Sequence, residues 1–508
     1  MSDVEDVATD WRKLDRRTVL ATALVMAGVA GGAALPVTLG LAGGMPLWQA
    51  LGWVLAGALL LISVGTGADY VRWRRTRYRI GPERAELHTG LLLVKRRSLA
   101  RERIRSVDLA ANPLLRILGL VKVRIGTGEQ SAGGESTLEL DPVSKAEGER
   151  LRTELLARLT AAAPGIHQEG VLGALDPSWI RYAPVSFVAP LLGGAAAGGV
   201  MQVSEWFGAQ GEVIDWVGDR FQDTPVVWTV AALVLAAVVA GAVGALGLWI
   251  EMWWNYRLER EPGGTLRVRR GLFTARSISI EERRLRGVEL VEPLGVRLFG
   301  AARVDAIATG LVDDSDDKHA DLKALLPPAP RAVANELAAR VLREPVAPTG
   351  SVSLTAHPRA ARTRRLRWAL TAVLLPVSVL AALGAWLTPV LLYVAGACAV
   401  VALPVAVALA LDAYRSLGHG ISGDYLVARS GTIRRATVAL QRGGVIGWTV
   451  RQSWFQRRAG VLTLTATTAA GAGAYSVYDA GEGEGLVFGA EAVPGVLEPF
   501  LVRGGGGG

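Results

Sequence analysis

The sequence predicts an integral membrane protein of the α plus β class: six transmembrane helices in three hairpins, each hairpin followed by a bent antiparallel sheet with a C-terminal helix. Three observations lead to this prediction. Of the 508 residues, 51% are hydrophobic and only 20% are charged, whereas soluble domains contain about 25% charged residues. Six apolar stretches come in three pairs. A polar region with the same internal spacing follows each pair.

Each apolar stretch is long enough for a membrane-crossing helix, which takes about 20 residues. No stretch has a charged side chain in its middle; Asp69, Glu251 and Asp412 stand at the ends. Arg16 and Arg17 before the first stretch also resemble a twin-arginine signal peptide, but a second stretch follows at once, which favours an uncleaved anchor. The predicted spans are Thr18–Gly43, Leu47–Ala68, Tyr182–Met201, Pro225–Ile250, Leu366–Leu387 and Val390–Leu411.

The basic residues predict the orientation of these spans. Lys and Arg number 55 against 46 Asp and Glu, and in a membrane protein such an excess more often sets topology than binds nucleic acid. The turns within the first and third pairs contain no Lys or Arg, and the longer turn at Gln202–Thr224 contains only Arg220. By the positive-inside rule, both termini and all three polar regions are therefore predicted to be cytoplasmic.

The polar regions repeat one pattern three times, which predicts three equivalent domains. Aligned on their first glycine, all three place an Arg at one fixed distance along the chain and a second glycine at another. Beside that turn a structural salt bridge or carbonyl contact is expected for the Arg, and a shared ligand role is the alternative. The repeat-defining residues are Gly90, Arg116 and Gly119 in the first copy, Gly271, Arg297 and Gly300 in the second, and Gly431, Arg457 and Gly460 in the third.

Each copy predicts β-strands followed by one helix. Short alternating segments on either side of the first glycine predict a β-hairpin, and further strands follow it. In the first copy Ser144 and Glu147 form a capping box, and Leu151, Leu155 and Leu159 share the apolar face of the helix that follows. Equivalent closing helices are predicted at 330–342 and 491–502.

Short motifs recur at matching places in the copies. The first copy has Tyr78-Arg-Ile, Gly90-Leu-Leu, Arg103-Ile-Arg-Ser-Val and Leu115-Arg-Ile-Leu-Gly-Leu after its hairpin. The second has Tyr256-Arg-Leu, Gly271-Leu-Phe, Arg284-Leu-Arg-Gly-Val and Val296-Arg-Leu-Phe-Gly. The third departs, with Gly444-Val-Ile-Gly-Trp in place of Arg-Ile/Leu-Arg. These motifs resemble the second bacterial pleckstrin-homology-like (PH-like) domain family, and three copies on three hairpins look like its long YdbT-type members.

The resemblance implies a multi-pass protein of the bacterial cell membrane, in which each hairpin is followed by a cytoplasmic PH-like domain. It implies a non-enzymatic scaffold or accessory protein that assembles with partner membrane proteins in envelope defence or resistance to membrane-active peptides. The usual companion of the YdbT type is a short YdbS-type protein with one copy, so such a partner is expected in the same bilayer. The family has no established catalytic residues, so no catalytic, cofactor or metal site is carried over.

The spans and copies together predict the domain boundaries. These are a cytoplasmic tail (1–17), hairpin 1 (18–70), PH-like domain 1 (71–163), a linker (164–178), hairpin 2 (179–254) with an extracytoplasmic segment (202–224), PH-like domain 2 (255–345), a linker (346–365), hairpin 3 (366–412), PH-like domain 3 (413–502) and a glycine tail (503–508).

A transporter or export component built on the six helices is the alternative function. Transporters usually place ionisable side chains or broken helices at the bilayer midplane, and the predicted spans have no charge there. An enzyme is disfavoured, because the single cysteine, Cys398, and five scattered histidines offer no metal or nucleophile cluster. No cofactor, metal or nucleic acid is therefore expected.

Ten arginines are candidate contacts for anionic phospholipid headgroups or for a partner. Six lie beside predicted spans, where a basic residue near an anionic surface is worth about 1 kcal/mol; the alternative is that they only set topology. Four lie in matching strands of the first two copies, on one strand face; the alternatives are a solvated face or contact between copies. The ten are Arg72, Arg74, Arg75, Arg77, Arg364 and Arg365 beside the spans, and Arg103, Arg105, Arg284 and Arg286 in the strands.

The segment Gln202–Thr224 is the only sizeable extracytoplasmic segment predicted. Four of its apolar residues recur at helical spacing, so it is expected to lie in the outer membrane interface. It would either meet a cationic peptide or serve as an interfacial spacer. The candidate residues are Trp206, Phe207, Ile214, Trp216 and Phe221.

Overall fold

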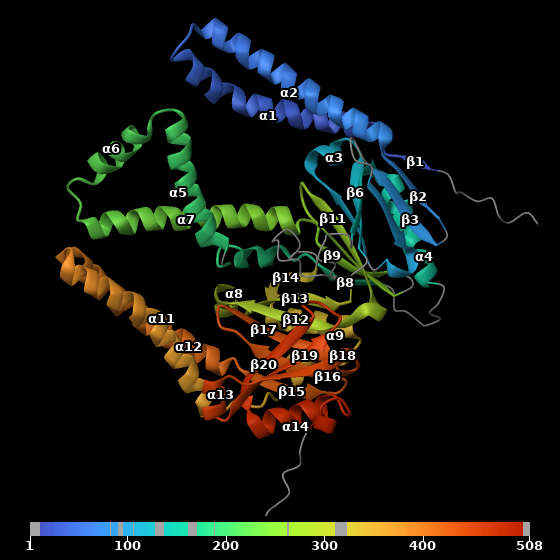
Figure 1. The fold of residues 1–508 in the computed structure, drawn as a ribbon, viewed down its shortest axis with the longest axis vertical. Helices are drawn as coiled ribbons and strands as arrows, with labels where there is room; N and C mark the ends of the chain where they lie inside the picture. The colour runs from blue at the N-terminus through green and yellow to red at the C-terminus, as the bar shows by residue number, and fades with distance from the viewer. Residues whose placement is uncertain are drawn as a thin grey trace, which may run out of the picture. The chain divides into compact units, whose positions relative to one another are not determined.

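The computed structural model describes residues 11–81, 83–89, 95–104, 106–126, 137–160, 170–186, 188–261, 264–309 and 323–500. The chain forms two compact units, 1–282 and 283–508. The boundary between the units falls within the second copy of the repeat. Figure 1 shows the elements of both units in the order of the chain.

The apolar stretches form long helices that pack in pairs: α1 with α2, α5 with α7, and α11 with α12 (Figure 1). Many large apolar side chains on these helices are exposed, such as Leu59 at 66% and Val227 at 75%, so these surfaces are suited to a lipid environment. The helices are α1 (Arg17–Ala42), α2 (Leu47–Arg75), α5 (Val188–Trp206), α6 (Gln210–Phe221), α7 (Val226–Trp253), α11 (Arg359–Trp386) and α12 (Pro389–Arg415).

Among the described residues, five helices are long and apolar enough to cross a membrane: α1, α2, α7, α11 and α12. Helix α5 occupies most of the third predicted span but is not one of the five, because its 19 residues include many glycines and end in polar side chains. Glycines bring it close to α7: a Cβ at Gly241 would collide with the carbonyl oxygen of Ala189, and a Cβ at Gly193 with that of Ala237. Such small residues permit close helix packing in membranes.

The first unit contains two sheets (Figure 1). A four-stranded sheet has the order β1 (Arg12–Lys13), β2 (Arg77–Ile80), β3 (Arg84–Thr89) and β4 (Lys95–Ala100). A seven-stranded sheet has the order β7 (Thr137–Ser144), β6 (Leu120–Gly126), β5 (Ser106–Ala111), β11 (Ala275–Glu281), β10 (Thr265–Arg270), β9 (Arg257–Glu261) and β8 (Gly170–Ala174). This second sheet therefore combines strands of the first and second copies. The unit also contains α3 (Pro113–Ile117) and α4 (Lys145–Thr160).

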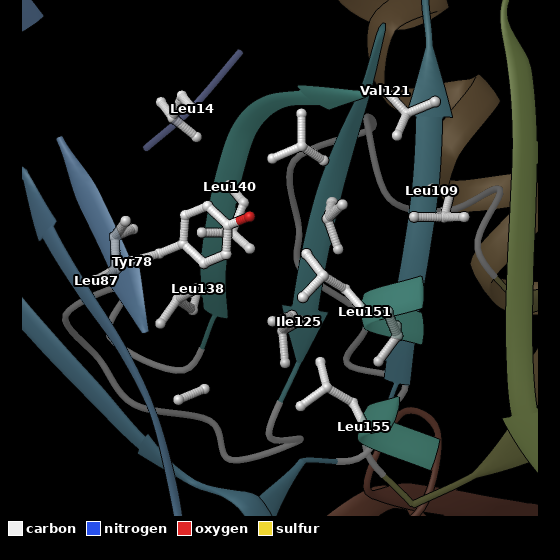
Figure 2. Close-up of a cluster of buried hydrophobic side chains, with 14 of the residues drawn as sticks. Leu14, Tyr78, Leu87, Leu109, Val121, Ile125, Leu138, Leu140, Leu151 and Leu155 are labelled. Carbon is white, nitrogen blue, oxygen red and sulfur yellow. The ribbon is translucent and has the colours of Figure 1, made fainter. Parts of the chain in front are cut away.

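The core of the first copy lies between its sheets and the closing helix α4. Figure 2 shows Leu151 and Leu155 of α4 beside Ile125 of β6, with Leu138 and Tyr78 across the cluster. Both leucines are buried, as the predicted helical face requires; the side chain of Leu159 lies outside the described part of the chain. The predicted N-cap is also present, because the Glu147 amide donates to Ser144 Oγ at 3.3 Å.

The second unit repeats this arrangement. A six-stranded sheet has the order β14 (Ala324–Pro330), β13 (Ala301–Ala308), β12 (Leu285–Pro293), β17 (Arg434–Gln441), β16 (Tyr425–Ser430) and β15 (Gly418–Ser422). It combines strands of the second and third copies. A three-stranded sheet has the order β18 (Val445–Arg451), β19 (Val461–Thr468) and β20 (Ala474–Gly481). The α-helices are α8 (Leu294–Leu298), α9 (Arg331–Leu342), α10 (Pro348–Ser351), α13 (Trp454–Arg458) and α14 (Glu482–Ala492).

Short 3-10 turns lie between consecutive strands of each copy. They are η1 (Arg101–Arg103) between β4 and β5, η3 (Glu282–Arg284) between β11 and β12, and η5 (Arg442–Gly444) between β17 and β18. Two others are η2 (Pro177–Tyr182) and η6 (Glu498–Phe500). The three matching turns show that the strands on either side of them are equivalent in the three copies.

The closing helix of the third copy was placed wrongly by the prediction at 491–502. It is α14, which ends at Ala492. Its glycine-rich sequence is a poor helix former, but Gly485 and Gly489 allow the helix to lie against Leu462 and Leu464 of β19. The closing helix of the second copy, α9, is where the sequence predicts it.

The second turn glycine has the same backbone conformation in every copy. The φ angles of Gly119, Gly300 and Gly460 are 71°, 68° and 62°, in the left-handed region that favours glycine. The first turn glycine has a positive φ at Gly271 and Gly431, and Gly90 lies outside the described residues. The repeat therefore preserves turn geometry.

Candidate functional site

Two strand pairs join neighbouring copies of the repeat. Strand β5 of the first copy pairs with β11 of the second, and β12 of the second pairs with β17 of the third. In both pairs, the strand after the 3-10 turn of one copy meets the strand before the 3-10 turn of the next. We call these pairs the first joint and the second joint. Each joint continues an antiparallel sheet from one copy into the next.

The two joints have the same register. When the copies are aligned on Gly90, Gly271 and Gly431, each residue pair of the first joint falls on a pair of the second. The matching pairs are Ala111–Ala275 with Glu292–Arg435, Ala110–Arg276 with Val291–Ala436, Leu109–Ser277 with Leu290–Thr437, and Ser106–Ile280 with Gly287–Leu440. One backbone association therefore occurs twice in the chain.

Ion pairs reinforce the second joint. The Arg435 guanidinium donates to both carboxylate oxygens of Glu292 at 2.8 Å, and Glu292 is 2% exposed. A second pair joins Arg434 and Glu289 at 3.0 Å. Bidentate pairs of this kind add directional hydrogen bonds to the charge attraction. At the place of Glu292 and Arg435 the first joint has Ala111 and Ala275.

A buried carboxylate occupies the same strand position at both joints. Asp108 and Glu289 are each 8% exposed, and they fall on one position when the copies are aligned on their first glycines. Burial raises the pKa of Asp108 to about 7, although the charge of Arg124 opposes this shift. Burial also raises the pKa of Glu289, against the attraction of Arg434. An acidic residue in an apolar strand of two copies is the sequence signal for this position, and the prediction missed it.

A basic cavity adjoins the first joint. It has a volume of about 1130 Å³ and is lined by β5, α4, the sheet strands β8–β11 and the C-terminal end of α7. Trp249 lies in that helix end and Trp254 directly follows it, and Arg270 lies 4.4 Å from the ring centroid of Trp253. The lining contains one acidic residue, Glu149, and seven basic ones: Arg116, Lys145, Arg257, Arg267, Arg269, Arg270 and Arg276.

The charges in this cavity favour an anionic ligand with an apolar part. Arg267 is paired with Glu149 at 2.7 Å and with Glu261 at 3.1 Å, which leaves a net positive lining. Tryptophan at the end of an apolar helix is typical of the membrane interface, and arginine binds phosphate groups with directional hydrogen bonds. The sequence signal was the run of arginines before Gly271, which the prediction treated only as a strand.

The recurring arginine connects its copy with the next one. Arg116 donates to the carbonyl oxygen of Leu272, which follows the first turn glycine of the second copy. Arg297 pairs with Asp412 at 2.7 Å, and Asp412 also accepts from Thr432 at 2.6 Å. Thr432 is the equivalent of Leu272. Arg457 belongs to the last copy and is exposed.

The other arginine candidates do not form one site. Arg72 pairs with Asp69 at 2.7 Å. Arg74 and Arg75 are exposed at the end of α2, and Arg77 is exposed at the start of β2. Arg364 and Arg365 both pair with Asp479, which is fully buried.

The prediction that four arginines share one strand face was wrong for Arg103 and Arg284, which lie in the 3-10 turns η1 and η3, because in each copy the chain turns there before the next strand begins. Arg284 is buried, and Arg286 donates to Gln441 at 3.2 Å beside the second joint. Arg105 and the side chain of Arg103 lie outside the described part of the chain.

The segment predicted as extracytoplasmic, Gln202–Thr224, contains the end of α5 and all of helix α6. Phe207, Ile214 and Trp216 are 47%, 55% and 66% exposed, and Phe221 is half-buried. The side chain of Trp206 is not among the described ones. The exposed apolar groups leave a surface suited to a membrane interface.

A buried histidine pair was not predicted. His357 Nε2 and His419 Nδ1 lie 3.0 Å apart, with 5% and 2% of the residues exposed. Burial lowers the pKa of both rings to about 4. The pair joins the segment before α11 to β15, and Phe488 of α14 packs on His419 at 4.6 Å between ring centroids. The two histidines are far apart in the sequence, so no local spacing could have revealed them.

Comparisons with known proteins follow the repeat. A family profile described as Bacterial PH domain matches residues 25–159, 212–341 and 354–487. A relative from Bacillus subtilis (strain 168), the UPF0699 transmembrane protein YdbT, is 22% identical over 412 residues, which are 78% of this chain and 80% of the relative. No solved structure matches the chain. Each profile match includes helical sequence ahead of the strands.

Proposed function

Because the chain belongs to the bacterial PH domain family, we propose that it is a non-enzymatic scaffold of the bacterial cell membrane. Its PH-like domains assemble with partner membrane proteins, among them a YdbS-type protein, in envelope defence. The observation that carries the proposal is the identical register of the two joints. A domain that associates twice through the same strand edges is suited to bind other domains by strand addition.

In this proposal both termini and all three PH-like domains lie in the cytoplasm. The flanking arginines support this orientation through the positive-inside rule. Helix α5 serves as the sixth span and completes the second hairpin. Its close packing on α7 and its exposed Leu191 and Val200, at 63% and 57%, support that role. The domain boundaries predicted above belong to the same proposal.

The basic cavity holds the headgroup of an anionic phospholipid in this proposal. Its net positive lining and its position at the end of α7 support a ligand with a phosphate and acyl chains. The test is lipid retention by the full chain in native mass spectrometry. We expect Arg269→Gln with Lys145→Gln to lower retention of acidic phospholipid several-fold, whereas Arg84→Gln, an exposed arginine of β3, should not. Equal retention by both variants would exclude this ligand.

The buried acidic residue of the first hairpin supports assembly over transport. Asp69 lies near the C-terminal end of α2, where it accepts from Thr22 at 2.8 Å and pairs with Arg72 at 2.7 Å. A transport site would need an ionisable group facing a cavity at the midplane. Solute uptake by proteoliposomes that contain the full chain would reinstate the transporter or export component.

Survival under a panel of membrane-active peptides tests the defence role. We expect a deletion strain to become sensitive and the intact gene to restore resistance. A version in which residues 202–224 are replaced by a short polar linker tests whether α6 meets the peptide. Unchanged survival of the deletion strain would exclude envelope defence.

A further inference from the structure

We propose that β18 is a docking edge that accepts, in antiparallel register, one strand of a PH-like domain on another polypeptide. The accepted strand is the one before the 3-10 turn of that domain, equivalent to β11 and β17. This inference rests on the proposed function, because it names the surface and the kind of partner through which the scaffold assembles.

Strand β18 stands in the third copy where β5 and β12 stand in the first two. It follows the 3-10 turn η5, as β5 follows η1 and β12 follows η3. Strands β5 and β12 each have two neighbours, one of which comes from the next copy. Among the strands that the structure describes, β18 has one neighbour, β19. Within the described part of the chain, β18 is therefore an edge of the type that forms the joints, without a second neighbour.

Burial at one equivalent position shows what the missing neighbour would cover. Leu109 is 6% exposed and Leu290 is fully buried, whereas the equivalent Val450 is 43% exposed. Next along the strand, Val291 is 1% exposed, whereas Arg451 is exposed. Ile446 is 67% exposed. A strand laid along β18 would cover apolar surface that the two joints already cover in the other copies.

Among the described strands, β4 and β18 are edges of the joint type without a neighbour across the joint, and the two edges differ in charge. Strand β18 has no charged residue from Val445 to Val450, and it contains no proline. Strand β4, which stands where β11 and β17 stand in later copies, begins with Lys95, Arg96 and Arg97. Proteins commonly protect exposed edges with charged side chains, especially Lys.

The start of the strand is not what distinguishes β4, because Arg276 of β11 takes part in the first joint. The difference lies at Arg96 and Arg97, where β11 has Ser277 and Ile278 and β17 has Thr437 and Val438. These two charges protect β4 against strand addition, whereas β18 has no such charge before Arg451.

The register argues against a second copy of the chain as the occupant. If β4 of another copy paired with β18 in the register of the joints, Arg96 would face Val450, at the place where the joints have Ser277 and Thr437. A charged side chain covered at such an apolar position costs free energy unless it is paired. The occupant is therefore a PH-like domain with a different edge strand.

The joints also define the sequence of the accepted strand. A small hydroxyl residue, Ser277 or Thr437, faces Leu109 or Leu290, and a large aliphatic residue follows three positions later, at Ile280 or Leu440. On β18 the same register places the hydroxyl residue opposite Val450 and the aliphatic residue opposite Gly447. A neutral or acidic residue opposite Arg451 completes the match. Strand β4 has Arg96 at the hydroxyl position, so it does not fit.

The test is site-specific photo-crosslinking of the full chain in the membranes of its own cells. A photoreactive amino acid replaces exposed Thr449, and a control replaces exposed Arg96 of β4. We expect position 449 to capture a polypeptide that contains a PH-like domain, at the strand before its 3-10 turn, at least tenfold more than position 96. Crosslinks to a second copy, to lipid, to a protein without a PH-like domain, or to nothing would overturn the proposal.

Substitutions at the edge provide a second test. Val450→Lys installs the type of charge that protects β4, and we expect it to reduce capture at position 449 at least tenfold. Val450→Thr keeps the shape without the charge and should retain capture, and the melting temperatures of both variants should match that of the parent. Equal capture by the parent and Val450→Lys would contradict the docking edge.

The peptide survival assay separates this inference from the proposed function. If position 449 captures a PH-like partner but the deletion strain loses no resistance, the docking edge is supported and the defence role is excluded. In the opposite case, resistance depends on the gene but is unchanged by Val450→Lys, and position 449 captures no partner. That outcome would support the defence role and exclude the docking edge.

Discussion

The first and second joints share one backbone register but differ in the side chains that occupy it. The second joint places Glu292 and Arg435 in a buried bidentate pair, while the first has two alanines there and opens onto the basic cavity. The strands and turns of the repeat therefore set the register of each joint. The side chains at the joint can then differ: they stabilise the strand pairing at the second joint, and they line a cavity at the first.

The largest effect is expected from a substitution that breaks the ion pair of the second joint. Glu292→Ala leaves the guanidinium of Arg435 at the joint without its buried partner, and we expect the second unit to lose about 3–5 kcal/mol of unfolding free energy. Hydrogen exchange of peptides from β12 and β17 in the full chain measures this loss. The double variant Glu292→Ala with Arg435→Ala should lose less, and an equal loss would show that the charge of Arg435 is not the cause.

The second largest effect is expected when the buried carboxyl group of the first joint, Asp108, is replaced. The pKa of Asp108 is about 7 in the folded chain against an ordinary 3.8, so protonation stabilises the folded state. That stabilisation is complete below about pH 4 and is lost as the pH rises through 7; linkage sets it at no more than about 4 kcal/mol. Asp108→Asn should therefore stabilise the first unit at pH 8 and flatten its pH dependence. A destabilised Asn variant would contradict the assignment.

The histidine pair should give the second unit the opposite pH response. Both rings have a pKa of about 4 in the folded chain against an ordinary 6.5, so the unfolded chain takes up protons first. Stability should be full above pH 6.5 and fall towards pH 4, by about 2 kcal/mol for each histidine at pH 5. Peptide-resolved hydrogen exchange at pH 7 and 5 compares the units. His357→Gln should remove about half of the stability loss between pH 7 and 5. If the pH dependence of stability is unchanged in this variant, the histidine pair is not its cause.

The smallest effect is expected when the ion pair of the second joint is introduced into the first joint. Ala111 and Ala275 line the basic cavity, which leaves room for longer side chains. We expect Ala111→Glu with Ala275→Arg to show a coupling of about 1 kcal/mol in a double-mutant cycle of unfolding free energies. The single variants should each destabilise the first unit. Zero coupling would mean that shared register alone does not make the joints interchangeable.

The sequence analysis succeeded where the signal was local and failed where residues distant in the chain had to come together. The leucines of α4 repeat at helical spacing and predicted their own burial, because periodicity is a local signal. Helix α14 lacks such a signal, since its glycines make it helical only through packing on β19. The run of arginines before Gly271 marked one wall of the basic cavity. The complete cavity and the histidine pair combine residues that are far apart in the chain, so spacing alone could not have brought them together.

The sequence by itself determined five long apolar helices, the threefold repeat, the turn glycines and the family, because each depends on run length, composition or spacing within a short segment. Only the tertiary structure decided which strand edges meet. Strands β5 and β11 are joined although helices α5, α6 and α7 lie between them in the chain, and nothing local selects a partner for a strand edge. That selection comes from register, from burial and from how charges at the edge are paired, and among the described strands it left β18 with one neighbour.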